Sequence, residues 1–354
     1  MSSQRYPSEL DDESIRQDLT RRDVLRTGVV AALGATWFRS SYSDDLDYKP
    51  AVQGRPSPPQ SAFGAKSTAE EVTAGLELNN MTALVTGCNS GIGFETMRVL
   101  AGRGVHVIGA ARTQEKAEKA CESVDGRTTP LVIELTDFDT IVAAAEKVKA
   151  MIKAIDMLIL NAGIMALPEL QQVNGIERQF VVNHLGHFVL ANQLKDSVIA
   201  ARQGRVVVVS SSAHVWAPEE GIQFDNLSGE MEYEPFRAYG QSKLANGLFS
   251  RELARRLADT RASSNSLHPG VIRTNLTRYI PGRDDEDAVP NPRMKSIPQG
   301  AATTCYVGAH PELRGVTGYY FSDCNPAHPN AHMQDDEMAA RLWEVSEELT
   351  ASYF

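Results

Sequence analysis

The chain has 354 residues, with 42% hydrophobic and 23% charged side chains, which is typical of a soluble globular protein. A net charge of −10 excludes the basic surface on which nucleic-acid binding depends, and no run of eighteen apolar residues indicates a membrane-spanning helix. The four cysteines follow no C-x-x-C pattern, and the pair His184 and His187 has no third ligand nearby. We therefore expect neither a disulfide framework nor a metal site.

The first 75 residues differ in composition from the rest of the chain. An apolar run at 27–38 follows charged clusters, and the stretch KPAVQGRPSPPQSAFGAKS is rich in Pro, Ser, Gly and Ala. That composition predicts a flexible linker. We divide the chain into a leader over 1–43, a linker over 44–75 and a single folded domain over 76–354.

From Leu76 onward, short apolar runs alternate with longer amphipathic ones. The predicted strands are 82–86, 105–110, 129–135, 157–161, 205–210, 264–268 and 318–321. The predicted helices are 93–102, 114–122, 138–155, 176–202 and 236–257. Continuous apolar strands separated by helices indicate an α/β fold, a single Rossmann-type doubly wound parallel sheet of about seven strands with helices on both faces. Such a sheet binds its ligand beyond the C-terminal ends of the strands.

A glycine-rich turn follows the first predicted strand. Gly87, Gly91 and Gly93 form G-x-x-x-G-x-G at the start of a helix. Glycine permits a tight turn and lets the backbone approach a pyrophosphate, which then rests against the positive end of the helix. The strand–turn–helix context favours a dinucleotide site, and the alternative is a purely structural turn.

The end of the second strand bears on which dinucleotide is bound. A site for NAD usually places an acidic residue there, which hydrogen-bonds the ribose 2′-hydroxyl. This chain has Ala111 and Arg112, and its first acid is Glu115. An arginine suits a 2′-phosphate, so we expect NADP rather than NAD. The alternative is an exposed arginine at a helix start.

Tyr239 and Lys243 are four residues apart in AYGQSKLAN. At that spacing both side chains share one face of a helix. Alone, the pair is compatible with a solvated helix face.

Several motifs in order resemble the short-chain dehydrogenase/reductase family, from about Leu76 to the C-terminus. TGCNSGIG resembles the cofactor turn, NAG at 161–163 the fourth-strand motif, YGQSK the Tyr-x-x-x-Lys motif and HPGVIRT the Pro-Gly segment. Longer stretches, among them VVNHLGHFVLANQL and GIQFDNLSGE, are similar to the branch with retinol dehydrogenases, WW-domain oxidoreductases and, more distantly, light-dependent protochlorophyllide reductases.

The resemblance implies a catalytic role for four side chains. Tyr239 would be the general acid/base, and Lys243 would lower its pKa and bind the nicotinamide ribose. A free tyrosine has a pKa near 10, and a neighbouring ammonium with the nicotinamide charge would bring it nearer neutrality. Ser211 would orient the substrate oxygen, and Asn183 would help hold a water relay. The alternative for Asn183 is a polar residue satisfied within a long helix.

The resemblance also implies the residues that contact the cofactor. They are Gly87, Asn89, Ser90, Gly91, Ile92, Gly93, Arg112, Glu134, Leu135, Asn161, Ala162, Gly163, Tyr239, Lys243, Pro269, Gly270, Ile272 and Thr274. Two positions depart from the family pattern. Glu134 stands where an aspartate is usual, which puts the adenine contact in doubt, and Leu160 replaces the first of two asparagines.

Two segments are expected to shape the substrate pocket. The 27 residues between Ser211 and Tyr239 carry Trp216, Phe224 and Tyr233, although these aromatic rings could serve packing alone. The polar, proline-rich stretch RYIPGRDDEDAVPNPRM is expected to form a mobile lid.

The function implied is an NADP-dependent oxidoreductase that moves a hydride between nicotinamide and a lipophilic alcohol or carbonyl substrate. The alternatives are a non-catalytic cofactor-binding or scaffold protein on the same fold, and a light-dependent tetrapyrrole reductase. The two longest predicted helices resemble those through which family members pair, so we expect a homo-oligomer.

Residues 20–26, Thr-Arg-Arg-Asp-Val-Leu-Arg, resemble the twin-arginine export signal. A short, weakly apolar segment follows, as that signal requires. Because this route carries folded proteins, it suits an enzyme that must first fold around a nucleotide. The expected partner is the twin-arginine export machinery, and the chain would be exported or membrane-anchored. The alternative is a cytoplasmic protein whose tail carries a chance arginine pair.

Overall fold

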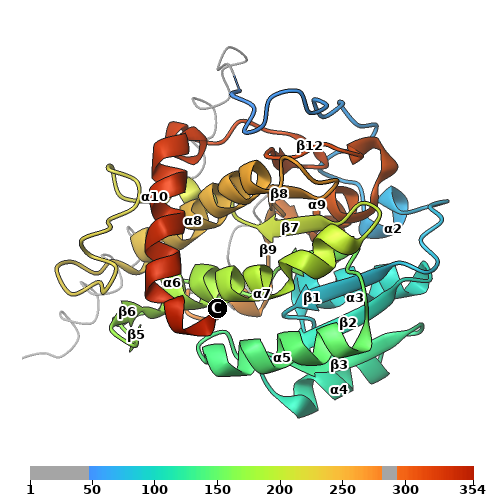
Figure 1. Ribbon diagram of the computed structural model, residues 1–354, viewed down its shortest axis with the longest axis horizontal. Helices are drawn as coiled ribbons and strands as arrows, with labels where there is room; N and C mark the ends of the chain where they lie inside the picture. Colours follow the sequence, from blue (N-terminus) through green and yellow to red (C-terminus); the bar gives the residue numbers. More distant parts are fainter. Residues whose placement is uncertain (1–47, 281–292) are drawn as a thin grey trace, which may run out of the picture. The chain divides into compact units, whose positions relative to one another are not determined.

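The computed structural model describes residues 48–280 and 293–354. Within them a central sheet has the strand order β12-β11-β8-β7-β4-β1-β2-β3 (Figure 1). The strands are β1 Thr82–Thr86, β2 His106–Ala111, β3 Thr128–Val132, β4 Met157–Leu160, β7 Arg205–Val209, β8 Ser263–His268, β11 Tyr320–Ser322 and β12 Asn325–Pro326. Every neighbouring pair is parallel except β11 and β12. The predicted doubly wound sheet is confirmed, and antiparallel β12 adds one strand at its edge.

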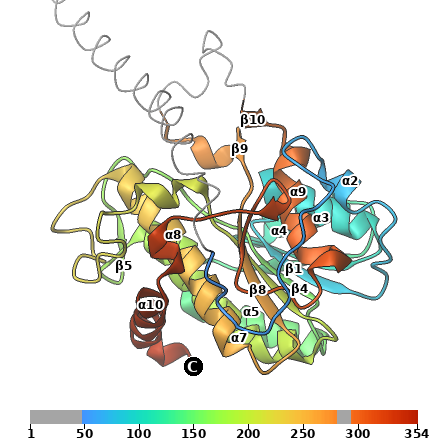
Figure 2. The same ribbon diagram turned by 90° about the horizontal axis from the view of Figure 1, so that it is seen from above.

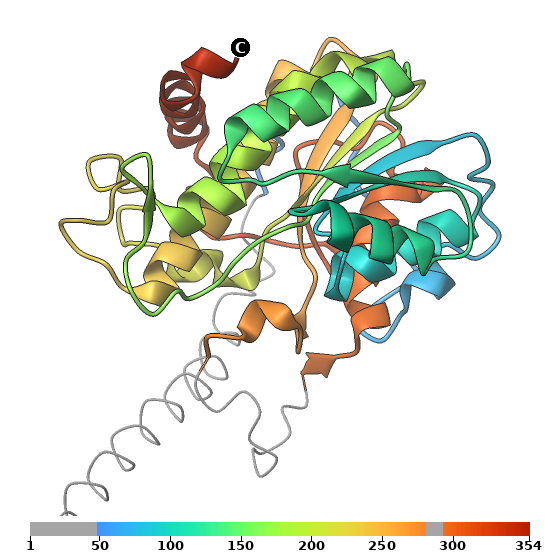
Figure 3. The same cartoon turned by 90° about the horizontal axis from the view of Figure 1, so that it is seen from below.

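Helices cover both faces of this sheet (Figure 3). One layer contains α5 Phe138–Met151, α7 Gly186–Ala200 and α8 Pro235–Arg256. The opposite layer contains α2 Ala69–Val72, α3 Gly91–Gly102, α4 Gln114–Glu122 and α9 Ile297–Ala309. Burial of all strand residues in β2, β4, β7 and β8 explains why these segments read as continuous apolar or small-residue runs.

The C-terminal helix α10, Asp336–Leu349, packs outside α7 and α8 (Figure 2). The Trp343 ring lies with its centroid 4.9 Å from that of Phe188 and 5.8 Å from that of Phe249. Asp336 pairs with Arg251, whose side chain is only 3% exposed. The helix therefore covers part of α7 and α8, and pairing with a second copy stays a prediction.

The predicted helix 176–202 is confirmed over 178–200, but its first two residues belong to a strand and one turn is π-helical. A short hairpin of β5 Gln172–Val173 and β6 Ile176–Glu177 comes first, followed by α6 Arg178–Phe180 and a π-helical turn at Val181–Leu185. The Glu177 carboxylate accepts hydrogen bonds from the backbone N–H groups of Gln179 (2.9 Å) and Phe180 (2.8 Å). This N-terminal cap starts the helix at 178, since it satisfies donors that lack partners at a helix end.

Residues 48–68, here called the strap, fall in the segment whose composition predicts a flexible linker. In the structure the strap lies against the folded domain. The Tyr48 ring stacks on Tyr319 with centroids 4.8 Å apart, and Arg55 donates to the carbonyl oxygens of Ala258 (2.8 Å) and Thr260 (2.6 Å). A few large side chains anchor a segment that has neither strand nor helix periodicity. The expectation of a flexible linker therefore does not hold for this part.

Two further expectations lie outside the described residues. The leader over 1–43 is one, and most of the expected lid, at 281–292, is the other. Across the two described ranges, none of the helices combines the length and apolar character needed to cross a membrane.

Candidate active site

A cleft of about 550 Å³ opens at the C-terminal ends of the central strands. All the sequence-predicted site residues except Asn183 line it: Gly87, Asn89, Ser90, Gly91, Ile92, Gly93, Arg112, Glu134, Leu135, Asn161, Ala162, Gly163, Ser211, Tyr239, Lys243, Pro269, Gly270, Ile272 and Thr274. The fold thus brings together residues that are up to 187 positions apart in the sequence, from Gly87 to Thr274. They meet at the edge where a doubly wound sheet binds ligands.

The glycine turn forms one end of the cleft. Gly87 and Gly91 have φ of +71° and +57°, which side chains rarely adopt, and a Cβ on Gly93 would lie 2.3 Å from the carbonyl oxygen of Gly87. Ser90, the N-cap of α3, makes no side-chain capping hydrogen bond. The first N–H groups of α3 therefore remain available to an anion beside them. This cradle fits a pyrophosphate.

The cleft is lined by more cations than anions. Arg112 and Lys116 line it next to the end of β2, Arg178 and Arg278 line it elsewhere, and Glu134 is the one carboxylate among the described residues that line it. Arg112 is exposed and forms no ion pair with any described residue. Lys116 was not among the predicted residues, although its place in the first turn of the helix that follows Arg112 could have indicated it. The charges suit a phosphate group.

The departure at Glu134 has a structural explanation. Its carboxylate accepts hydrogen bonds from the backbone N–H of Thr136 (3.2 Å) and the Thr136 hydroxyl (2.9 Å). The side chain therefore closes a local turn, and one oxygen is committed there. Neighbouring Leu135 is buried, with 5% of its surface exposed.

Tyr239 and Lys243 lie side by side on α8, each 3% exposed. The Lys243 Nζ donates to the carbonyl oxygen of Val209 at 3.1 Å and lies 5.7 Å from the centroid of the tyrosine ring. Burial lowers the pKa of Lys243 to about 8. An amine with this pKa is still mostly protonated at pH 7.

The expectation of a Tyr239 pKa near neutrality is not met in the protein alone. Burial raises the pKa of the phenol above its ordinary value, and a hydrogen bond with Ser211 lowers it in part. The physical reason is desolvation, which disfavours the phenolate. A further positive charge at the site would be needed to bring this pKa down.

Asn183 lies behind the cleft in the π-helical turn. Its amide nitrogen donates to the carbonyl oxygen of Ile164 (2.9 Å) and to the Ser242 hydroxyl (2.9 Å), and its amide oxygen accepts from the Ile164 N–H (2.8 Å). A Cβ on Gly163 would lie 3.1 Å from that oxygen. The side chain therefore holds the segment that follows β4 and links it to α8.

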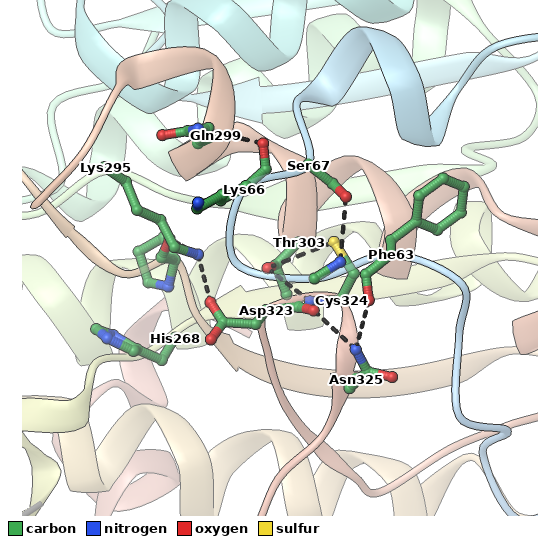
Figure 4. Close-up of polar contacts among 12 residues, drawn as sticks. Phe63, Lys66, Ser67, His268, Lys295, Gln299, Thr303, Asp323, Cys324 and Asn325 are labelled. Carbon is green, nitrogen blue, oxygen red and sulfur yellow. Dashed lines mark hydrogen bonds and ion pairs between the residues drawn. The ribbon is translucent and has the colours of Figure 1, made fainter. Parts of the chain in front are cut away.

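The Pro269–Gly270 turn lines the cleft and is supported from the sheet edge. The Lys295 ammonium forms an ion pair with Asp323 (Figure 4) and donates to the carbonyl oxygen of Pro269 at 3.4 Å. Asp323 and Cys324 both have positive φ, of 54° and 60°, which is strained for residues other than glycine.

The strap supports the turn that carries Asp323 and Cys324. Its Ser61 hydroxyl donates to the carbonyl oxygen of Cys324 at 2.8 Å, and the Ser61 N–H donates to the Asn325 side chain at 2.9 Å. The backbone N–H of Cys324 donates to the Thr303 hydroxyl at 3.1 Å. A segment from far upstream in the sequence thus braces the strained turn that carries Asp323.

Apolar side chains pack around Tyr239, and of these Leu276 also lines the cleft. Met165, Ala166 and Ala213 form a buried cluster with Tyr239, and Phe236, Leu276 and Ile280 pack against it. The Trp216 side chain, 43% exposed, meets the Phe236 ring edge-on at 5.9 Å.

The three aromatic residues of the insert have separate roles. Trp216 contacts Phe236, which packs against the apolar cluster around Tyr239. Phe224 packs instead beneath Arg341 of α10, 4.1 Å from its guanidinium carbon, and the Tyr233 hydroxyl donates to the carbonyl oxygen of Leu167 at 2.7 Å. Two of the three therefore serve packing or loop structure.

Comparison with known proteins agrees with this fold and site. Residues 81–284 match the short chain dehydrogenase family. The chain is 41% identical over 306 residues to the short-chain dehydrogenase TIC 32 B, chloroplastic, of Brassica napus, covering 83% of this chain and 96% of that protein. It is 36% identical to human retinol dehydrogenase 14, covering 76% of this chain and 86% of that protein.

A solved structure shows the same architecture. An uncharacterised protein from Mycobacterium paratuberculosis superposes with a TM-score of 0.65 at 32% identity, covering 79% of this chain and 97% of that one. The chain belongs to the short-chain dehydrogenase/reductase family and is an NAD(P)-dependent oxidoreductase.

Proposed function

We propose that this protein is an NADP-dependent dehydrogenase or reductase of lipophilic alcohols or carbonyl compounds, with Tyr239 as its general acid/base. The observation that carries the proposal is the position of the Tyr239 phenol. It is buried beside Lys243 and hydrogen-bonded with Ser211, in an apolar cluster at the end of a cleft whose other end is basic.

The cofactor preference rests on Arg112 and Lys116. Both line the cleft next to the end of β2, where a carboxylate would favour the free ribose hydroxyls of NAD. Two cations there suit the 2′-phosphate of NADP by charge-assisted hydrogen bonds. When bound, the nicotinamide supplies the hydride chemistry.

The chain's own residues handle the proton. Tyr239 donates to or accepts from the substrate oxygen, and the Ser211 hydroxyl hydrogen-bonds the same oxygen and the phenol. The Lys243 ammonium, 5.7 Å from the ring centroid, favours the phenolate by its charge. Asn183 keeps the segment after β4 in place, and the Val209 carbonyl oxygen holds the ammonium of Lys243.

The apolar side chains of the cleft support a lipophilic substrate. Ile164, Leu167, Val182 and Leu276 line it, so a substrate gains affinity there by burying hydrocarbon surface. Similarity to a protein called retinol dehydrogenase 14 points the same way.

Purified protein would be mixed with NADPH or NADP and a panel of lipophilic ketones, aldehydes and alcohols, and absorbance followed at the reduced-nicotinamide band. We expect turnover with at least one substrate, faster with the phosphorylated cofactor. Cofactor binding with no turnover across the panel would favour the scaffold alternative. Turnover only under illumination with a tetrapyrrole would favour the light-dependent one.

Location and assembly follow from separate features. The twin-arginine resemblance supports export, and the alternative is retention in the cytoplasm. Fractionation of cells that make the wild type and an Arg21→Lys/Arg22→Lys variant tests this, since only an exported protein would shift compartment between the two. Homo-oligomerisation would have to use a face other than that covered by α10, and light scattering of the pure protein measures it.

A further inference from the structure

Two of the four buried cysteines meet directly beneath the cofactor turn. Cys88 lies in the glycine-rich turn after β1, and Cys121 lies in the last turn of α4. Gly109 of β2 separates them: a Cβ built there would lie 2.9 Å from the Cys121 sulfur and 3.1 Å from the Cys88 sulfur. The same point is 2.8 Å from the Met97 sulfur, so three sulfur atoms surround one glycine.

The two sulfurs are neighbours, because each lies close to the same point at Gly109. The Cys121 thiol donates to the Met97 sulfur at 4.0 Å. The interaction between the two thiols lowers the pKa of Cys121 and, with burial, raises that of Cys88. The thiolate is the form that reacts with oxidants, so Cys121 is the first of the two to react. Because it lies at the end of a nine-residue helix, where local opening costs least, it is also the more accessible of the pair.

We propose that Cys88 and Cys121 form a redox-modification site, in which a peroxide converts the two thiols to a disulfide and thereby weakens NADP binding. The proposal rests on the cofactor site described above. The proposed disulfide forms only on oxidation and joins two cysteines far apart in the sequence. It is therefore not the permanent disulfide framework that the cysteine spacing argues against.

The chemistry balances with hydrogen peroxide as the oxidant. The Cys121 thiolate attacks one peroxide oxygen, the O–O bond breaks, and protonation gives a sulfenic acid and one water. The Cys88 thiol then attacks the sulfenic sulfur, forms the S–S bond and expels the hydroxyl group as a second water. Two thiols lose two electrons in total, and the peroxide gains them.

The bond would reshape the phosphate cradle. A disulfide needs sulfurs about 2.05 Å apart and Cα atoms at about 4.4–6.8 Å. Cys88 is held by its own N–H, which donates to the Ala110 carbonyl oxygen at 3.1 Å, beside the bond from Gly87 to the same oxygen at 2.9 Å. Drawing Cys88 toward α4 pulls on this pair of hydrogen bonds. Asn89, Ser90 and Gly91 follow at once in the chain, so the cradle moves with it.

The full-length protein would be treated with hydrogen peroxide, alkylated and digested, and its disulfides mapped by mass spectrometry. NADPH affinity would be measured by fluorescence before oxidation, after it and after reduction with dithiothreitol. We expect a Cys88–Cys121 peptide and an affinity loss of about tenfold, the effect of one charge-assisted hydrogen bond, which the reductant reverses. NADPH added beforehand should slow oxidation.

The Cys121→Ala variant should bind NADPH as the wild type does and lose its sensitivity to peroxide. Cys305→Ala is the matched control, because Cys305 is also buried in the same helical layer but lies near Cys324 and away from the glycine turn. It should keep the full response.

Several results would overturn the proposal: no Cys88–Cys121 peptide, a bridge between Cys305 and Cys324 instead, or a mapped bridge with unchanged NADPH affinity. Failure of the reduced wild type to bind NADPH would instead contradict the proposed function. The two ideas therefore fail separately.

Discussion

The two ends of the cleft are built in different ways. The cofactor end comes mainly from 35 consecutive residues, 82–116, which form β1, the glycine turn, α3, β2 and the start of α4. The catalytic end combines Ser211 after β7, Tyr239 on α8 and the Pro269–Gly270 turn after β8, and the strap braces it from residues 48–68. The geometry of a local motif is set by neighbouring residues in the sequence. The geometry of a site assembled across the sheet depends on separate tertiary contacts, each of which can be removed by a substitution.

The two ends of the cleft also differ in how far their charged side chains are exposed to solvent. At the cofactor end, the cation Arg112 is exposed. At the catalytic end, burial lowers the pKa of Lys243 to about 8 and that of His268 to about 3. A charged side chain therefore keeps its hydration where the phosphates would lie, and is strongly desolvated where the proton moves. Substitutions at the catalytic end should change rate and pH dependence, and those at the cofactor end should change affinity.

The largest effect is expected at Tyr239. In Tyr239→Phe the ring still fills its place in the apolar cluster but has no proton to transfer, so kcat should fall by about 10²–10⁴-fold. NADPH affinity should remain nearly unchanged. Stopped-flow turnover and fluorescence titration of the same preparation measure both. Near-normal turnover would remove Tyr239 from the chemistry.

Lys243→Met should lower both kcat and NADPH affinity, and it should also alter stability with pH. The folded-state pKa, about 8, is below the ordinary 10.5, so the unfolded chain binds the proton more tightly between these values. The free energy of unfolding of the cofactor-free protein should therefore gain a contribution as pH rises from 8 to 10.5, and lose it as pH falls to 8. Urea unfolding at several pH values should show this contribution in the wild type only. Identical pH profiles would show that Lys243 is not desolvated.

Arg112→Ala tests the cofactor end. Loss of a charge-assisted hydrogen bond to the 2′-phosphate should weaken NADPH by roughly tenfold or more and leave NADH affinity nearly unchanged. Arg127→Ala is the matched control, since Arg127 is exposed on the same half of the domain but does not line the cleft. Equal losses for the two cofactors would mean that Arg112 does not distinguish them.

The smallest effect is expected at Lys295. This prediction tests whether its contacts position the Pro269–Gly270 turn or only stabilise the fold. Lys295→Met keeps the packing against Gly270 but removes the ion pair with Asp323 and the hydrogen bond to Pro269, so NADPH affinity should fall by about threefold to tenfold. Arg55→Met removes strap contacts at the end of α8 and should lower Tm without that loss. If both variants lower affinity to the same extent for the same loss of Tm, the Lys295 contact has no specific role.

Much of the fold could be predicted because its determinants are local. β1 and α4 have the predicted bounds, since alternation of apolar strands and amphipathic helices repeats within short windows. The glycine turn was predictable for the same reason: positive φ at Gly87 and the close approach at Gly93 exclude side chains at those positions. Resemblance to a family then placed residues from distant segments in one cleft.

What the sequence by itself determined is therefore the order of the elements, the cofactor turn and many of the residues that line the cleft. The tertiary structure alone decided the π-helical turn that carries Asn183, the docking of the strap, the Lys295–Asp323 pair and the meeting of Cys88 with Cys121. The physical reason is that these contacts join residues that no periodicity or spacing relates. Their energies come from burial and hydrogen bonding between surfaces that meet only once the sheet has formed.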